Sequence, residues 1–268
     1  MVAGVVIGAT AVSLVDSGDP APTSAVTPTS AATATSPEPA ETTAAPADVT
    51  EPQPPASDAT TPPPTTAPPA GVSDPVAVAE AIGPIPVPSD CGLPLDVPES
   101  MPGADRSYRG GVHEGIDFIC RERGRQATTP LPGRVLLAER TYEDPEPSDR
   151  QAVLAIGKEL GRTPPWILAM MFGRFVVIDH GIIPGAGNVV TIYAHLEEVD
   201  AAMQAGAQVP AGARVGEIGR RGTESGGTGA DNPNALHLHW EIHVDERYLG
   251  EGSDIATTRA TYAALFDR

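Results

Sequence analysis

Three of the six histidines in this 268-residue sequence lie in one short run, LHLHWEIH at positions 236–243. Apolar and polar residues alternate along the run, which is typical of a β-strand with one buried face. The alternation places His237 and His239 side by side on the other face. Two imidazoles in that arrangement could serve a metal ion, or a metal ion and its reacting water. An exposed strand that merely carries histidines is the alternative, and the run alone leaves it open.

A second pair of residues with possible metal chemistry, His113 and Asp117, stands in the stretch GGVHEGIDF at positions 110–118. A spacing of four would put both side chains on one face of a helix. The three glycines and the β-branched residues of the stretch instead favour an extended or looped backbone. Such a backbone can still bring an imidazole and a carboxylate to one ion. A surface histidine beside an aspartate in a turn is the alternative.

Short apolar runs bounded by glycine and proline predict the strands that would hold these residues. The runs at 175–180 and 189–196 are separated by a glycine-containing turn, so we expect them to pair as an antiparallel hairpin. Further strands are expected at 134–138 and 214–219. The sequence contains no Gly-x-Ser-x-Gly elbow and no His-Glu-x-x-His motif.

Helical patterns are confined to two places in the second half of the chain. Apolar residues recur with helical spacing at 151–160, and Thr163-Pro164-Pro165 has the composition of an N-cap and first turn before the apolar run 166–172. A closing helix is expected at 255–266. We therefore predict a mainly β fold, an antiparallel, sandwich-like domain with a helical insertion at about 141–172 and a C-terminal helix.

The N-terminal part of the chain differs in composition from the rest. Residues 1–15 are small and apolar, which fits part of a signal peptide or membrane anchor, or else an apolar tail without consequence. Residues 16–75 are dominated by Pro, Thr, Ala and Ser and predict a disordered linker. Residues 76–109 are expected to form a wrapping arm, and 110–268 the folded domain. Export with a tether to a membrane through the N-terminus would suit this organisation.

Charge argues against a nucleic-acid partner. The formal net charge is -18, and no Lys or Arg precedes Arg106. From that residue onward the chain is only mildly acidic, so no basic patch is available to neutralise phosphates.

The only two cysteines are Cys91 and Cys120. In an exported protein an even count favours one disulfide, which would tie the segment after the linker to the strand that carries Asp117. In a cytosolic protein the pair would instead be two reduced thiols.

With these motifs in order, the sequence resembles the lysostaphin/LytM-type zinc metallopeptidases, which cut peptide bonds in bacterial peptidoglycan. The match covers roughly residues 110–245, about half of the chain. It is carried by the combination of HEGIDF at 113–118, YAHL at 193–196 and HLH at 237–239, supported by the strands at 175–181 and 215–219.

The resemblance implies that His113, Asp117 and His239 bind Zn²⁺, and that His195 and His237 act beside the open coordination position. The two histidines would serve as general base or as donors to the developing oxyanion. Three protein ligands and a water are typical of a catalytic zinc site, whereas structural sites are usually closed by four protein ligands.

The remaining polar residues near the motifs receive lesser roles. Glu241 lies on the face of His239 and is expected to orient a ligand or to form a structural hydrogen bond. His180 is expected to be structural, and His243 has no assigned role. The connection from Ala138 to Phe175 is longer than the resemblance would lead one to expect, and we expect residues 166–172 within it to form a cleft wall, a lid or a docking surface, or simply to pack on the core.

The function implied by the resemblance is zinc-dependent endopeptidase activity on peptidoglycan peptides by a secreted or surface-tethered, extracytoplasmic protein. The bond that is cut remains open between glycyl-glycine and one involving D-Ala and a diamino acid, and the oligomeric state is also open. The alternative is an inactive relative that binds the cell wall or activates another hydrolase. In such a relative we expect replaced ligands, whereas here all five site residues are present.

Overall fold

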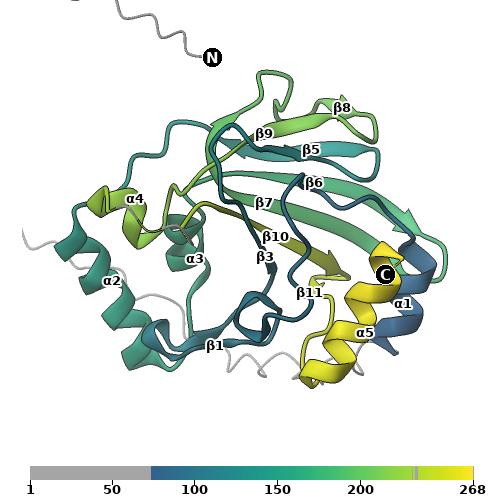
Figure 1. Ribbon diagram of the computed structural model, residues 1–268, viewed down its shortest axis with the longest axis horizontal. Helices are drawn as coiled ribbons and strands as arrows, with labels where there is room; N and C mark the ends of the chain where they lie inside the picture. The colour runs from purple at the N-terminus through teal and green to yellow at the C-terminus, as the bar shows by residue number, and fades with distance from the viewer. Residues whose placement is uncertain (1–73, 231, 233–234, 268) are drawn as a thin grey trace, which may run out of the picture. The chain divides into compact units, whose positions relative to one another are not determined.

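The computed structural model describes residues 74–230, 232 and 235–267 (Figure 1). The apolar segment 1–15 and nearly all of the predicted linker 16–75 lie outside these ranges. Within the described ranges, no helix has both the length and the apolar character needed to span a membrane.

Strands dominate the described part of the chain, and their pairings are antiparallel. One nine-stranded sheet follows the order β11-β10-β7-β6-β5-β8, with β3 added to β10 and with β9 and β4 added through β7. The predicted mainly β, antiparallel fold is therefore confirmed, and its strands form one branched nine-stranded sheet and a separate two-stranded sheet of β1 and β2. The strands are β1 (Asp105–Arg106), β2 (Gly111–Val112), β3 (Ile116–Ile119), β4 (Gln126–Thr128), β5 (Gly133–Glu139), β6 (Arg174–Ile183), β7 (Gly187–Val199), β8 (Gln208–Val209), β9 (Arg214–Ile218), β10 (His237–Val244) and β11 (Arg247–Tyr248).

Two helices lie between β5 and β6, as the sequence predicts, and a third closes the chain (Figure 1). The first begins four residues before the predicted start at 151, because Pro147 can occupy a position in the first turn where no backbone N–H is needed. Two further helices were not predicted. The helices are α1 (Pro75–Ile82), α2 (Pro147–Leu160), α3 (Pro165–Phe172), α4 (Glu224–Thr228) and α5 (Ile255–Phe266).

The predicted cap of the second inserted helix is wrong by one residue. Pro164 is the N-cap of α3 and makes no side-chain capping bond. The Thr163 hydroxyl instead donates to the carbonyl of Arg109 at 3.1 Å and accepts from the Arg109 guanidinium at 2.8 Å. The threonine therefore joins the helical segment to the stretch that precedes His113.

The segment 76–109, predicted as a wrapping arm, contributes a helix to the core. Helices α1 and α5 lie side by side (Figure 1), and Val78, Ala79 and Ile82 of α1 are buried. Their backbones come close at Gly83, where an added Cβ would lie 2.7 Å from the Leu265 carbonyl oxygen. The core therefore includes residues well before the motif at 113–118.

The predicted disulfide between Cys91 and Cys120 is present, with the two Cα atoms 5.2 Å apart. Cys120 directly follows β3, and its backbone N–H donates to the carbonyl of Leu236, just before the histidine strand. The disulfide thus holds the residues after the linker to the end of β3.

The sheet branches at His195 of β7. Along one edge, residues 189–194 of β7 pair with β10, and residues 196–199 pair with β9. His195 itself has a φ of 62°, an uncommon conformation for a residue with a side chain. Such conformations cost free energy and are found most often at functional sites.

Candidate metal centre and active-site pocket

Three donor atoms from the region of β3 and β10 meet at one point. His113 Nε2, Asp117 Oδ1 and His239 Nδ1 are each 3.0 Å from the other two. Asp117 and His239 lie directly opposite each other in the antiparallel pairing of β3 with β10. The sheet register therefore brings together residues that are 122 positions apart in the sequence.

His113 reaches the same point because Gly115 lets the chain turn tightly against β10. A Cβ on Gly115 would lie 2.5 Å from the Trp240 carbonyl oxygen and 2.9 Å from Cε1 of His239. The close approach at Gly115 explains why His113 and Asp117 come together on an irregular backbone and not on a helix.

Hydrogen bonds on the far side of each imidazole determine which nitrogen faces the centre. The Nδ1–H of His113 donates to the Met101 carbonyl at 3.1 Å, which leaves Nε2 as the free lone pair. The Nε2–H of His239 donates to Glu241 Oε1 at 2.7 Å, which leaves Nδ1 facing the other donors. Partners of this kind orient metal-binding histidines and raise their basicity. Glu241 thus orients a ring, as expected from its place on the strand.

The groups around Asp117 favour the ionised form of its carboxylate. Burial would raise the pKa of Asp117, but the nearby His113 and His237 lower that pKa well below its usual range. Arg106 also lies within ion-pair distance, 3.7 Å from Asp117 Oδ2. Burial would lower the pKa of His239, but hydrogen bonds to Asp117 and Glu241 outweigh burial and raise it to about 9.

The donor set fits a zinc ion. Two imidazole nitrogens and one carboxylate oxygen are common zinc ligands, with bond lengths of ~2.0–2.2 Å. Donor atoms 3.0 Å apart can share one ion at such distances. Three protein ligands leave one coordination position for water or substrate, as in catalytic zinc sites.

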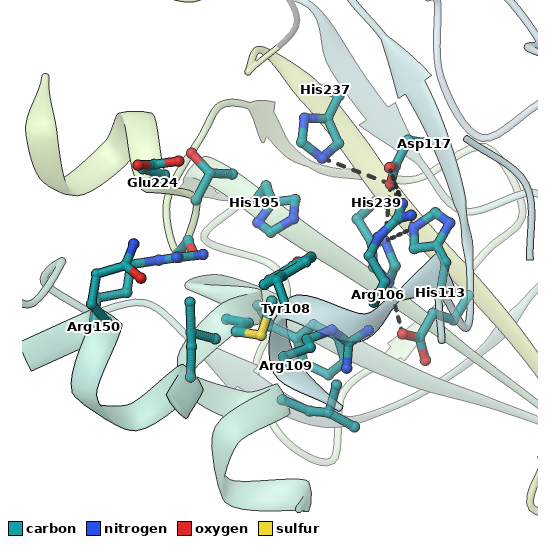
Figure 2. A pocket seen from close by; sticks show the side chains of 18 residues that line it. Arg106, Tyr108, Arg109, His113, Asp117, Arg150, His195, Glu224, His237 and His239 are labelled. Carbon is teal, nitrogen blue, oxygen red and sulfur yellow. Dashed lines mark hydrogen bonds and ion pairs between the residues drawn. The ribbon is translucent and has the colours of Figure 1, made fainter. Parts of the chain in front are cut away.

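His195 and His237 stand side by side next to this cluster, with ring centroids 4.7 Å apart (Figure 2). The Nδ1–H of His195 donates to the Arg221 carbonyl at 2.7 Å, and that of His237 donates to the Ala235 carbonyl at 3.0 Å. The Nε2 of each ring is therefore the unprotonated nitrogen, and that of His237 lies 3.7 Å from Asp117 Oδ1, beyond hydrogen-bond distance (Figure 2). Burial lowers the pKa of both imidazoles, that of His195 well below its usual range, so both are neutral at pH 7.

Backbone hydrogen bonds through Gly219 keep these two histidines together. The Gly219 N–H donates to the His195 carbonyl at 2.9 Å, and the His237 N–H donates to the Gly219 carbonyl at 3.3 Å. A side chain at 219 would collide with Glu197, 2.5 Å from its backbone nitrogen. Gly219 therefore links β7 and β10 at the point where the sheet branches.

The carbonyl that orients His195 is itself held against α3. Gly222 and Gly173 both have positive φ, and their backbones approach so closely that a Cβ on Gly222 would overlap the Met171 carbonyl. The Arg221 side chain is held by Glu197 at 2.9 Å and Asp144 at 3.3 Å. The end of the helical segment thus supports the loop that positions His195.

A pocket of about 430 Å³ opens over the five residues. Its apolar wall comes from α2 and α3, as the cleft-wall hypothesis for 166–172 requires, through Leu154, Leu168, Met171 and Phe172. The Phe172 ring stacks on His239, with centroids 5.7 Å apart and planes 29° apart. Trp166 is more than half exposed and does not line the pocket.

Several pocket residues were not foreseen from the sequence. Arg106, Tyr108, Arg109 and Arg150 line the pocket together with the histidines (Figure 2). They belong to no motif, and only the tertiary structure brings them to the site.

The other two histidines lie outside the donor cluster. His180 contacts the Pro132 carbonyl and the Thr191 hydroxyl, both at 2.8 Å, in keeping with a structural role. The Nε2–H of His243 donates to Glu241 Oε2 at 2.7 Å. Glu114, Glu241 and His243 form a second group of close donors, but both oxygens of Glu241 already accept hydrogen bonds from histidines.

Residues 111–250 match the sequence model of peptidase family M23. The match covers just over half of the chain, and the chain therefore belongs to this family. The comparison with curated protein sequences gives no significant match.

Three of the solved structures that are similar to this chain are as follows. A zinc-containing peptidase from Vibrio cholerae has 19% identity, covers 51% of this chain and 28% of its own, and has a TM-score of 0.32. Csd3 of Helicobacter pylori has 18% identity, coverages of 61% and 30%, and a TM-score of 0.34. The catalytic domain of the antimicrobial peptidase lysostaphin from Staphylococcus simulans has 16% identity, coverages of 55% and 73%, and a TM-score of 0.30. This chain thus spans less than a third of the first two proteins.

Proposed function

We propose that this protein is a zinc-dependent endopeptidase that hydrolyses peptide bonds in bacterial peptidoglycan. Membership of peptidase family M23 supports the reaction class. The observation that carries the proposal is the convergence of His113 Nε2, Asp117 Oδ1 and His239 Nδ1, each 3.0 Å from the others, at the floor of a pocket.

In this proposal His113, Asp117 and His239 hold the zinc ion. Bound zinc supplies Lewis acidity to the scissile carbonyl and lowers the pKa of a water molecule. The carboxylate of Asp117 is ionised and the lone pair of His113 is free, so neither ligand needs to lose a proton at neutral pH.

His195 and His237 are the groups that accept and later return the proton of the attacking water. Each is neutral at pH 7 with its Nε2 unprotonated, so either can accept the proton of the attacking water. Neither can donate from Nε2 until it has taken a proton. The imidazolium formed in the first step can then stabilise the oxyanion and return the proton to the leaving amine.

The apolar wall supplied by α2 and α3 limits the access of water to the same pocket. Electrostatic interactions with the developing oxyanion gain strength in such an environment. Phe172, stacked on His239, also restricts the motion of that ring.

We propose that the protein acts outside the cytoplasm, secreted or tethered to the cell surface. The Cys91–Cys120 disulfide supports this location, because disulfides persist in oxidising compartments. The segment 1–15 would then belong to a signal peptide or anchor, and the linker 16–75 would hold the domain 110–268 away from the membrane.

Peptide release from purified sacculi by the zinc-loaded full chain tests the proposal. We expect the wild-type protein to release soluble peptides, and we expect chelation of the metal to abolish this release. His237→Ala is the matched control, since it should keep zinc but lose cleavage. A wild-type protein that binds sacculi and zinc yet releases no peptides would favour the inactive relative.

A further inference from the structure

We propose that Arg150 forms a carboxylate-binding subsite in the active-site pocket, so that the enzyme prefers peptides with a free carboxylate near the scissile bond. The inference rests on the proposed function, because it assumes that the substrate is a peptide. It adds the chemical class of that peptide, which neither the family nor the metal centre specifies.

Arg150 is a buried arginine that lacks an anionic partner. Its side chain is 8% exposed, and its Nη2 donates to the Gly222 carbonyl at 3.3 Å. Its Nε has no hydrogen-bond partner among the described residues. No described carboxylate lies within ion-pair distance of it. A buried charge without a partner is unfavourable, so a site of this kind is suited to a charge supplied by a ligand.

The other arginines of the pocket are already engaged. Arg106 is ion-paired with Asp117, and its guanidinium donates to the carbonyls of Asp105 and Glu99. Arg109 donates from both terminal nitrogens, to the Thr163 hydroxyl and the Val112 carbonyl, and only its Nε lacks a partner among the described residues. Arg150 has a single hydrogen bond from its guanidinium and is therefore the pocket arginine with the most unused donors among the described residues.

The acidic residues of the pocket are likewise accounted for. Asp117 belongs to the donor cluster, and Glu241 accepts hydrogen bonds from two histidines. Glu224 lines the pocket mouth, but it is exposed and forms no ion pair within the described residues. None of these carboxylates neutralises Arg150.

The position of Arg150 suits recognition next to the reacting bond. It extends from α2 on the side of the pocket opposite His113 and Asp117, with His195 between (Figure 2). Its neighbour Leu154, one turn along α2, is 3% exposed and apolar. A guanidinium in partly apolar surroundings binds a carboxylate more strongly than one in water, and its planar shape allows two parallel hydrogen bonds.

A carboxylate-binding subsite would distinguish two kinds of peptidoglycan cross-link. A bridge made only of glycine carries no carboxylate beside its peptide bonds. Stem peptides that contain a dicarboxylic diamino acid, such as diaminopimelic acid, carry a free carboxylate on that residue, and often a free C-terminal carboxylate. Arg150 therefore favours cleavage within stem-peptide cross-links over cleavage of glycine bridges.

The test compares three forms of one cross-linked stem-peptide dimer with the zinc-loaded full chain. The first has both carboxylates free, the second has the diamino-acid carboxylate amidated, and the third has the C-terminal carboxylate amidated. We expect kcat/KM to fall about ten- to a hundredfold for one amidated form, the range of a charge-assisted hydrogen bond. The form that loses activity identifies which carboxylate Arg150 binds.

Arg150→Gln should lower kcat/KM for the free-carboxylate dimer to the value of that amidated form, and leave the amidated form unchanged. Arg162→Gln is the matched control, because Arg162 is exposed at the end of α2 and does not line the pocket. Equal cleavage of all three dimers by the wild-type protein would overturn the proposal. An equal loss for all three in Arg150→Gln would also overturn it, since a structural role through Gly222 acts on every substrate alike.

A failure of the proposed function gives a different result. In that case the wild-type protein cleaves none of the dimers. Calorimetric binding of the same three peptides to the metal-free protein then tests the subsite, with no metal to attract the carboxylates. Tighter binding of the free-carboxylate dimer in the wild-type protein, lost in Arg150→Gln, supports the subsite, and equal binding refutes it.

Discussion

The histidines of the site differ in role because each ring nitrogen has a different partner. His239 gives its Nε2–H to Glu241, and His113 gives its Nδ1–H to the Met101 carbonyl, so each directs its other ring nitrogen to the donor cluster. His195 and His237 give their Nδ1–H to backbone carbonyls, which leaves Nε2 unprotonated, as the proposed proton transfer requires. Strand alternation groups His237 and His239 together, but their hydrogen bonds separate them.

Zinc binding should release a proton from His239. Without metal, its pKa of about 9 means that the ring is doubly protonated at pH 6.5, whereas zinc needs the Nδ1 lone pair. The pKa of His113 is lowered by burial, so that ring contributes little proton release. We expect about one proton per zinc at pH 6.5, and an affinity that rises with pH until it nears 9.

Calorimetry in buffers of different ionisation enthalpy measures this proton release. Glu241→Gln is a useful comparison, since it removes a charge that raises the pKa of His239 and should reduce the release. A binding heat that is the same in all buffers would contradict the assignment of His239 as a ligand protonated in the metal-free state.

The five residues that the structure brings together were predicted from the sequence. Spacing suggested the pairs His113–Asp117 and His237–His239, and the family resemblance added His195 and the division of roles. Arg150 could not be found in this way. It follows an acidic, proline-broken stretch, and its significance depends on two things that are visible only in the fold: its burial and the absence of an anion near it.

At the scale of elements, the branch of the sheet at β7 determines where His195 and His237 lie. β7 leaves β10 and joins β9 at His195, and Gly219 connects the two histidine-bearing strands at that point. The end of α3 supports the same region through the close backbone contact of Gly173 and Gly222. The inserted helices thus contribute to the position of His195 as well as to the wall of the pocket.

Gly222→Ala should therefore reduce cleavage without removing the metal. An added Cβ would overlap the Met171 carbonyl and would also be strained at a φ of 80°, so the loop must move and carry the Arg221 carbonyl with it. We expect at least a tenfold loss of kcat, since about 1.4 kcal/mol of lost transition-state stabilisation has that effect.

Gly212→Ala is the control for the backbone strain alone. Gly212 has a φ of 79°, but nothing lies within 4 Å of an added Cβ, and the residue is remote from the pocket. Zinc content is measured for both variants beside peptide release. Equal activity of the two variants would show that the contact between α3 and the loop does not position His195.

The elements that the sequence predicted are those with strong local signals. The alternating strand β10, the hairpin of β6 and β7, and the closing helix α5 all appear near their expected bounds. Helix α1 was missed because it is short and lies among prolines, and it is stabilised by packing against α5 at the other end of the chain. Helix α4 contains two glycines, which disfavour a helix, and it depends on the cap by Thr223 and on contact with α2.

At the scale of the whole molecule, the disulfide closes a loop that contains two of the three residues of the candidate metal centre. The loop closed by Cys91 and Cys120, 29 positions apart, contains both His113 and Asp117. Such a crosslink stabilises the fold mainly by restricting the unfolded chain. For a loop of this length, we expect reduction to lower the free energy of unfolding by about 3–4 kcal/mol.

Urea unfolding of the metal-free protein, with and without reductant, measures this contribution. A variant with both cysteines replaced by serine serves as the control, because its stability should not respond to the reductant. If the stability of the wild-type protein is also unaffected by reductant, the crosslink does not restrain the unfolded chain as described.

Zinc content and peptide release, measured on the same samples of His239→Ala and His195→Ala, test the central claim most directly. Both variants should release less than a hundredth of the wild-type peptide from sacculi, since removal of a catalytic group typically costs ~10²-fold or more. Only His195→Ala should retain about one zinc per chain. A His239→Ala protein that keeps its zinc and cleaves sacculi would contradict the account.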